Sequence, residues 1–207
     1  MKPALLQRCG LLRDQRGVSA VEFALLAVPF FTILMGGSDL AHSAYVKSQL
    51  QGALSDSARL ASVQDPGFTA AGTTLEERIE NTVKAQVDPV APRATYTIEI
   101  SNFYDFSGIG NPEKLMTDVN ANGSYDAADN DCFEDLNENG SYDTDTGRAG
   151  VGGANDVVFY RATLTMPRLF PVAGWLGLSN TTSLEASSAV RNQPYADQAL
   201  PPVLCGV

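Results

Sequence analysis

The amino-terminal part of this chain contains an apolar run about as long as a bilayer is thick. It extends from Val18 to Gly37 and includes a single carboxylate, Glu22. About twenty residues at ~1.5 Å each match a hydrocarbon core of ~30 Å. An acid inside such a span is costly and marks a functional site by default. The run therefore predicts a transmembrane helix in which Glu22 has a specific role.

The residues before this run are basic, which predicts its orientation. Residues 1–17 contain Lys2, Arg8, Arg13 and Arg16 against one acid, Asp14. Lys and Arg beside a spanning helix favour the cytoplasmic side, so we expect the amino end inside and the rest translocated. A secretory signal is the competing interpretation, but its apolar stretch is short and followed by a small-residue cleavage site. Here the stretch has membrane length, and Gly17 precedes it.

Composition excludes several function classes. The 207 residues leave room for one domain, 65–207, beyond the anchor. A net charge of −10 offers no basic surface for nucleic acid. The sequence has no phosphate-binding glycine motif, zinc spacing or serine-nucleophile elbow, and the single histidine, His42, has no supporting group. We expect neither an enzyme nor a small-molecule substrate.

The periodicity predicts an α+β fold. No proline interrupts Phe30 to Asp65, so one helix should run from Val18 to about Gln64, with 18–37 in the membrane and 38–64 in the periplasm. A second helix is expected over 72–87, capped by Thr73 with Glu76 or by Thr74 with Glu77. Three β-rich runs follow: 95–100, 156–166 and 181–191. Helices followed by strands indicate a small antiparallel sheet packed on the long helix, a pilin-like arrangement.

An acidic segment between the first two strand runs contains a tandem repeat. Residues 118–126 recur as 135–143, with seven of nine positions identical. Oxygen side chains at positions 1, 3 and 5, followed by glycine at 6, match the pattern of a calcium loop. The expected ligands of the first loop are Asp118, Asn120, Asn122, Ser124 (backbone), Asp126 and Asp129. Those of the second are Asp135, Asn137, Asn139, Ser141 (backbone), Asp143 and Asp145.

The second loop departs from this pattern at its end. Thr146 occupies position 12 and Asp145 lies one residue early, so closure falls to Asp145, to the other loop or to water. Neither repeat is flanked by the two helices of an EF-hand. Hairpin turns would explain the Asn-Gly pairs, but not the aspartates at positions 1 and 9 of both copies. We therefore predict structural calcium in an insertion spanning 113–148.

The cysteines divide between the two sides of the membrane. Cys9 lies in the basic leader, whereas Cys132 and Cys205 would lie outside the cytoplasm, where disulfides persist. Two thiols there suggest one bridge, with two unpaired thiols as the alternative.

The stretch 16–25, RGVSAVEFAL, resembles the amino-terminal signature of TadE-like proteins. These are minor pilins or pseudopilins of the Tad (tight adherence, Flp) pilus assembly system. Residues 132–148, 152–158, 167–171 and 184–195 resemble a subset of that family that carries the acidic insertion.

The resemblance implies that a prepilin peptidase cleaves between Gly17 and Val18. It also implies that Glu22 pairs with the new α-amino group, its own or that of a neighbouring subunit. The implied protein is non-enzymatic and acts in pilus assembly, with other pilin subunits and the Tad machinery as partners. It spans the bacterial inner membrane once, with its amino end cytoplasmic, and it either enters the fibre or only assists assembly. The rival function is a membrane-anchored, calcium-dependent adhesion or recognition module, which retention of residues 1–17 would favour.

Overall fold

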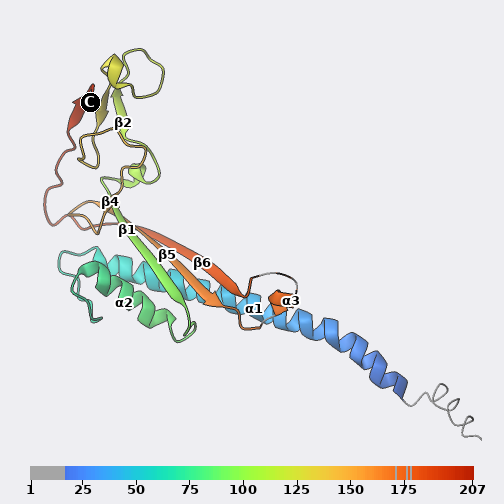
Figure 1. Cartoon of the computed structure of the whole chain (residues 1–207). Helices are drawn as coiled ribbons and strands as arrows, with labels where there is room; N and C mark the ends of the chain where they lie inside the picture. Colours follow the sequence, from blue (N-terminus) through green and yellow to red (C-terminus); the bar gives the residue numbers. More distant parts are fainter. Residues whose placement is uncertain (1–16, 171, 176, 178) are drawn as a thin grey trace, which may run out of the picture. The chain divides into compact units, whose positions relative to one another are not determined.

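The computed structural model describes residues 17–207 except 171, 176 and 178, and it has an α+β fold (Figure 1). The predicted leader, with Cys9, lies outside the described residues apart from Gly17. The chain forms two compact units. The described part of the first consists of residues 17–42 and 168–180, and the second consists of 43–167 and 181–207.

Two helices come first in the chain, and the strands follow, with the acidic loops on either side of one short strand and a short third helix between the last two long strands. The helices are α1 (Val18–Ala61), α2 (Leu75–Val87) and α3 (Val172–Trp175), with 3-10 turns η3 (Phe106–Gly108) and η4 (Ala127–Asp129). The strands are β1 (Thr95–Phe103), β2 (Lys114–Thr117), β3 (Cys132–Glu134), β4 (Arg148–Ala149), β5 (Val157–Pro167), β6 (Thr181–Arg191) and β7 (Val203–Cys205). The predicted α+β class, with its long amino-terminal helix, is confirmed.

The two main helices end and begin where hydrogen bonds replace the helical ladder. Helix α1 stops at Ala61, three residues before the expected Gln64, where the N–H and the hydroxyl of Ser62 both donate to the Arg59 carbonyl, at 3.4 Å and 2.8 Å. Helix α2 starts at Leu75 because the hydroxyl of Thr74 accepts the N–H of Glu77 at 3.2 Å. The Glu77 carboxylate in turn accepts the hydroxyl and the N–H of Thr73, both at 2.7 Å, and these two bonds to the carboxylate lower the pKa of Glu77.

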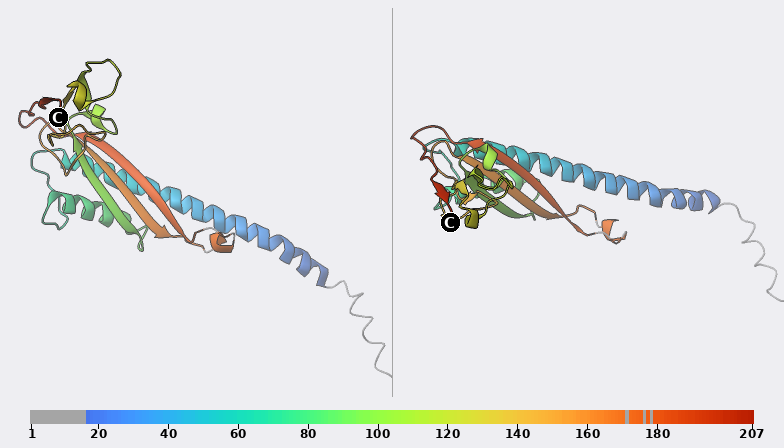
Figure 2. Two further views of the ribbon diagram at one scale, coloured as in Figure 1. Left: turned by 45° about the horizontal axis from the view of Figure 1, so that its top comes forward. Right: turned by 90° about the horizontal axis from the view of Figure 1, so that it is seen from above.

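The second unit is built on a four-stranded antiparallel sheet in the order β4-β1-β5-β6. Helix α2 and the carboxy-terminal part of α1 lie on the same face of this sheet (Figures 1 and 2). Leu50 and Leu54 of α1 and Tyr160 of β5 are fully buried between these layers. The outer face is polar: Arg161 lies 3.9 Å from Glu99 and 3.4 Å from Glu185 across the strands.

A second, three-stranded sheet, β2-β3-β7, accompanies the acidic loops. Its strands are three or four residues long, and the sequence did not predict them. Cys132 and Cys205 pair across β3 and β7 and form a disulfide. The bridge fixes the carboxy-terminal strand to the strand that lies between the two repeats.

Candidate functional site

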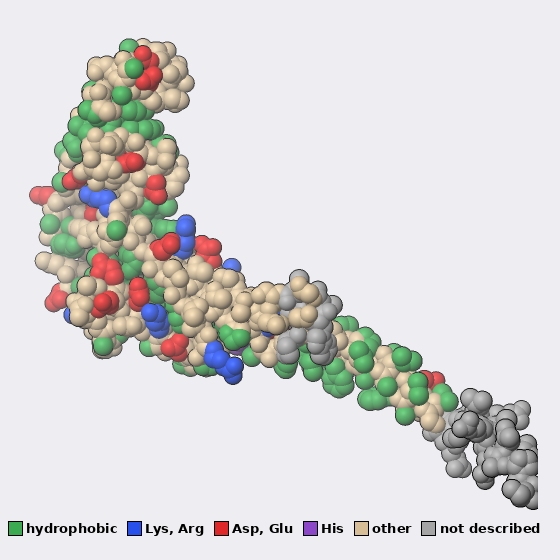
Figure 3. All heavy atoms as spheres, viewed as in Figure 1, with side chains coloured by type: hydrophobic (Ala, Val, Ile, Leu, Met, Phe, Trp, Pro, Cys, Tyr) green, Lys and Arg blue, Asp and Glu red, His purple; other side chains and the backbone are tan. Residues whose placement is uncertain are grey.

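The first candidate site is the amino-terminal part of α1. Among the described residues, α1 is the one helix long and apolar enough to cross a membrane, with a window of mean hydropathy 2.1. None of that window is buried inside the protein, so it is not a core helix. Phe23 is 70 % exposed and Ile33 is 75 % exposed, and Figure 3 shows green apolar side chains gathered along this stretch. Such continuous apolar exposure needs a nonpolar surrounding.

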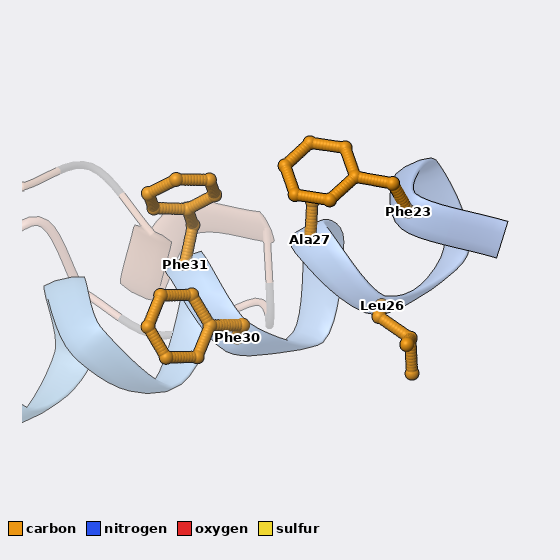
Figure 4. A pocket seen from close by; sticks show the side chains of 5 residues that line it. All are labelled: Phe23, Leu26, Ala27, Phe30 and Phe31. Atoms are coloured by element: carbon orange, nitrogen blue, oxygen red, sulfur yellow. The ribbon is translucent and has the colours of Figure 1, made fainter. Parts of the chain in front are cut away.

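Apolar side chains form two adjoining rows near the helix start. Phe23, Ala27 and Phe31 follow one another at four-residue intervals, with Leu26 and Phe30 beside them (Figure 4). Together they line an open hollow of about 270 Å³, in which the rings of Phe30 and Phe31 meet edge to face at 5.5 Å. The hollow has no polar lining atom and therefore suits lipid or another apolar helix.

The three predicted processing residues lie together at this end. Gly17 immediately precedes α1, and both Gly17 and Glu22 are exposed. Val18 and Glu22 are four residues apart, so they occupy one face of the helix one turn from each other. A free amino group on Val18 would lie at the positive end of the helix dipole, within a turn of that carboxylate.

The second candidate site is the pair of acidic loops, which share one hydrogen-bond pattern. In the first loop, the Asp118 carboxylate accepts the N–H of Asn122 at 3.2 Å and that of Gly123 at 2.7 Å. In the second, the Asp135 carboxylate accepts the N–H of Asn139 at 3.1 Å and that of Gly140 at 2.8 Å. The repeat in the sequence is therefore a repeat in structure.

The tight curl of both loops depends on left-handed backbone at the same two positions. Gly123 and Gly140, at position 6, have φ of +79° and +83°. Ala121 and Glu138, at position 4, have φ of +57° and +59°, which side-chain-bearing residues rarely adopt. Two residues per loop thus hold a left-handed conformation that lets the chain curl tightly at this point.

Polar side chains meet from opposite sides of each loop. In the first, the amide of Asn120 donates to the carboxylate of Asp129 at position 12. In the second, the amides of Asn137 and Asn139 both donate to the carboxylate of Asp143 at position 9, the former at 2.9 Å. The amide side chains of the two loops therefore bind acids at different positions, 12 in the first loop and 9 in the second.

A buried carboxylate from outside the repeat braces each loop. Asp131, 0 % exposed, accepts the N–H of Val119 at 2.8 Å and that of Asp126 at 3.0 Å. These are positions 2 and 9 of the first loop.

Glu113, 2 % exposed, makes the equivalent pair in the second loop. Its carboxylate accepts the N–H of Leu136 at 2.9 Å and that of Asp143 at 3.0 Å, again positions 2 and 9. Burial raises the pKa of Glu113, although these two N–H groups act in the opposite direction. Neither brace is predicted by the sequence, in which both residues are distinguished only by their place in an acidic run.

Equivalent tyrosines join the loops to each other. Tyr125 and Tyr142, both at position 8, stack with ring centroids 4.6 Å apart. The fully buried Phe133 of β3 meets both rings edge on, at 5.0 Å and 5.5 Å. Such contacts contribute about 0.5–1.5 kcal/mol each beyond their buried area. The loops are therefore one paired structure built around β3.

The remaining predicted ligands have other contacts. Asp126 accepts the N–H of Ala128 at 2.9 Å and caps η4. Asp145 accepts the N–H of Gly147 at 3.0 Å and borders a hollow of about 230 Å³. Thr146 is fully buried and donates to the Gly108 carbonyl at 3.1 Å, so its hydroxyl points into the fold and does not close the second loop.

The expected ligand atoms of each loop are oxygens, half of them from carboxylates and half from amide side chains and the backbone. Within 17–207, apart from the three undescribed positions, no group of three or more His, Cys, Asp or Glu side chains is arranged to hold a metal ion. In each loop the Asp at position 1 and the Asn side chains at positions 3 and 5 instead accept backbone N–H groups. Oxygen-only donor sets of this kind suit a hard cation.

The comparison with known families concerns the first site. Residues 17–59 match the family model described as TadE-like protein. The matched stretch starts at Gly17 and covers the apolar span, Glu22 and most of the rest of α1. The match supports a relation to the TadE-like family, which suggests a Tad pilus-related protein. It ends before the sheet and the acidic loops, about which it says nothing. No curated protein and no solved structure matches the chain.

Proposed function

We propose that this chain is a non-enzymatic, TadE-like minor pilin or pseudopilin that acts in assembly of a Tad/Flp-type pilus. The observation that carries the proposal is the coincidence of the family match with an exposed apolar helix that begins at Gly17-Val18. In this proposal α1 anchors the protein once in the bacterial inner membrane. The amino end faces the cytoplasm, and the sheet-bearing part lies in the periplasm.

Glu22 is assigned to the new amino terminus. A carboxylate in lipid is tolerated when it meets a cation, and cleavage before Val18 would create one within a helical turn. The partner amine belongs to the same chain or to a neighbouring subunit. Either pairing gives Glu22 a role that begins only after the leader is removed.

Intact mass and amino-terminal sequencing test the processing step. The protein is purified from its host with and without the prepilin peptidase. Mature protein that begins at Val18 only when the peptidase is present supports the proposal, and protein that begins at Met1 in both hosts contradicts it. Gly17→Ala should also block cleavage, because the side chain alters the residue before the scissile bond.

Glu22→Ala separates processing from assembly. It should leave cleavage intact and reduce pilus formation, because the amine loses its partner. Ser19→Ala, on the same turn of α1, is the matched control and should leave both unchanged. Normal piliation with Glu22→Ala would remove the proposed pairing.

We further propose that the paired acidic loops bind structural calcium. The support is the repeated arrangement of carboxylate, amide and backbone oxygens, in which side chains converge from both sides of each loop. Calcium bound by these groups would offset the repulsion among the acids of the 113–148 segment. Extracellular calcium modules bind at ~10⁻⁴–10⁻³ M, which suits an ion of structural use.

A further inference from the structure

We propose that Asn122, in the first acidic loop, is a site of spontaneous deamidation, whereas its counterpart Asn139 in the second loop is protected. Deamidation converts the side-chain amide into a carboxylate and so adds a negative charge at position 5 of the first loop. The reaction requires neither the proposed pilus role nor a bound calcium ion.

Both sites are asparagine-glycine pairs, which the chain contains only twice, at 122–123 and 139–140. Glycine has no side chain, so nothing shields its backbone nitrogen from the side chain of the preceding asparagine. Both pairs continue identically as Asn-Gly-Ser-Tyr-Asp. In an unfolded chain the two sites should therefore react at similar rates, and a large difference between them has to come from the fold.

The reaction consumes only water. The backbone nitrogen of Gly123 attacks the side-chain carbonyl carbon of Asn122, and the new N–C bond closes a succinimide ring. The glycine N–H proton leaves to a base, and the side-chain nitrogen of Asn122 takes up a proton and departs as ammonia. Water then opens the ring at either carbonyl and gives aspartate or isoaspartate.

The first loop has hydrogen bonds that assist this attack. The Asp118 carboxylate accepts the N–H of Gly123 at 2.7 Å, so a proton acceptor already lies on the attacking nitrogen. The N–H of Ser124 donates at 2.7 Å to the side-chain oxygen of Asn122, where negative charge develops during the attack. Asn122, Gly123 and Ser124 are all exposed, so water can reach the ring that forms.

The second loop repeats these two bonds but also holds the leaving group. Gly140 donates to Asp135 and Ser141 donates to the side-chain oxygen of Asn139, both at 2.8 Å. In addition, the side-chain nitrogen of Asn139 donates to the carboxylate of Asp143. The backbone nitrogen has to approach the carbonyl carbon from above the amide plane, so the amide must turn before it reacts. In the second loop this turn breaks the bond to Asp143.

The acids at position 9 explain why the loops differ. Asp143 is fixed in place, because the buried Glu113 accepts its N–H at 3.0 Å. Its counterpart Asp126 instead accepts the N–H of Ala128 at 2.9 Å and caps η4. Within the described part of the chain, the side-chain nitrogen of Asn122 donates to no other residue. Its amide is therefore free to turn.

The test compares the two sites within one molecule. The full-length protein is incubated in detergent and EGTA at neutral pH, and peptide mass spectrometry follows the replacement of NH₂ by OH at each asparagine. We expect Asn122 to react at least about ten times faster than Asn139, which must first break a charge-assisted hydrogen bond. In reduced protein in denaturant the two rates should become similar. Equal rates in the folded protein, a faster Asn139, or deamidation confined to the denatured chain would overturn the proposal.

Variants at position 9 identify the cause of the protection. Asp143→Ala releases the amide of Asn139 and should raise its rate toward that of Asn122, whose own rate should not change. Asp126→Ala is the matched change in the first loop and should leave the ratio of the two rates near its native value. Asp143→Asn keeps an acceptor oxygen without the charge, and it replaces Asp143→Ala if that variant does not fold. An unchanged rate at Asn139 in the folded variant would overturn the protection assigned to Asp143.

Discussion

The brace on the first acidic loop predicts a large effect from a one-atom change. Asp131→Asn keeps the size of the side chain but replaces one acceptor oxygen by an NH₂ group. The wholly buried carboxylate accepts two N–H groups, at 2.8 Å and 3.0 Å. In the variant one of these donors faces another donor.

The expected loss in free energy of unfolding follows from the hydrogen bond that the variant cannot make. Leaving one buried donor without an acceptor costs about 1–3 kcal/mol, and the surviving bond loses its charge assistance, so the loss is about 2–3 kcal/mol. Removing one negative charge weakens the repulsion among neighbouring acids and offsets part of this at low salt. Stability should therefore be measured at high salt, where the repulsion among these acids is screened. For a protein of this size the loss corresponds to a fall in Tm of about 4–12 °C.

The assay is thermal unfolding of the full-length protein in detergent and EGTA, combined with amide hydrogen exchange. Exchange locates the effect, since the amides of Val119 and Asp126 should lose protection first. Asp129→Asn is the matched control, because it removes the same charge from the same loop but from a partly exposed side chain that braces no backbone. It should change stability by about 0.5 kcal/mol or less. Equal melting and equal exchange in the two variants would refute the bracing role of Asp131.

Three further effects follow from the same geometry. If each loop binds calcium with a Kd of ~10⁻⁴–10⁻³ M, about 10 mM free ion should add about 1.4–2.7 kcal/mol per loop to the free energy of unfolding and raise the Tm by several degrees over EGTA. The double variant Asp118→Asn with Asp135→Asn should abolish this effect. Identical melting curves of the native protein with calcium and with EGTA would exclude the ion. The Cys132–Cys205 bridge has a sequence separation of 73, so replacing both cysteines by serine should cost about 4 kcal/mol in chemical denaturation on the chain-entropy estimate, and no loss would mean that the reduced segment is already constrained. Leu54→Ala removes a fully buried side chain of α1 and should lower the free energy of unfolding by about 2–5 kcal/mol. Leu60→Ala, on the exposed side of the same helix, should lower it far less, and equal losses would contradict the assigned packing face.

The elements that the sequence predicted are the long ones, which contain several periods of their hydrophobic pattern. Helix α1 and strands β1, β5 and β6 are long enough for their patterns to stand out, and their expected bounds agree with the structure to within a few residues. The sequence offered two capping pairs for α2, Thr73 with Glu76 and Thr74 with Glu77, and the structure contains the second. The sheet β2-β3-β7 was missed because strands of three or four residues carry no readable alternation.

The loop braces were missed for a different reason. The internal repeat places its equivalents at an offset of seventeen residues, as from Asp118 to Asp135. Applying that offset to Asp131 leads to Arg148, which cannot accept an N–H group. The second brace comes instead from Glu113, upstream of both loops. A role taken over by a non-equivalent residue is invisible to a search by repeat, because only the three-dimensional positions coincide.

The presence of a separate brace in each loop limits what a bound calcium ion would have to contribute. Each loop already has a buried carboxylate that joins its positions 2 and 9, and the Tyr125–Tyr142 stack joins the loops to each other. The backbone curl therefore has protein partners of its own, so a bound ion would contribute mainly by offsetting charge repulsion. We accordingly expect calcium to stiffen a loop pair that is already folded, unlike a zinc finger, which folds only when metal binds. Removing calcium should then speed amide exchange much more in 118–146 than in β5, whose exchange should change only as far as the global stability falls. Equal acceleration of both regions would show that the ion holds the fold.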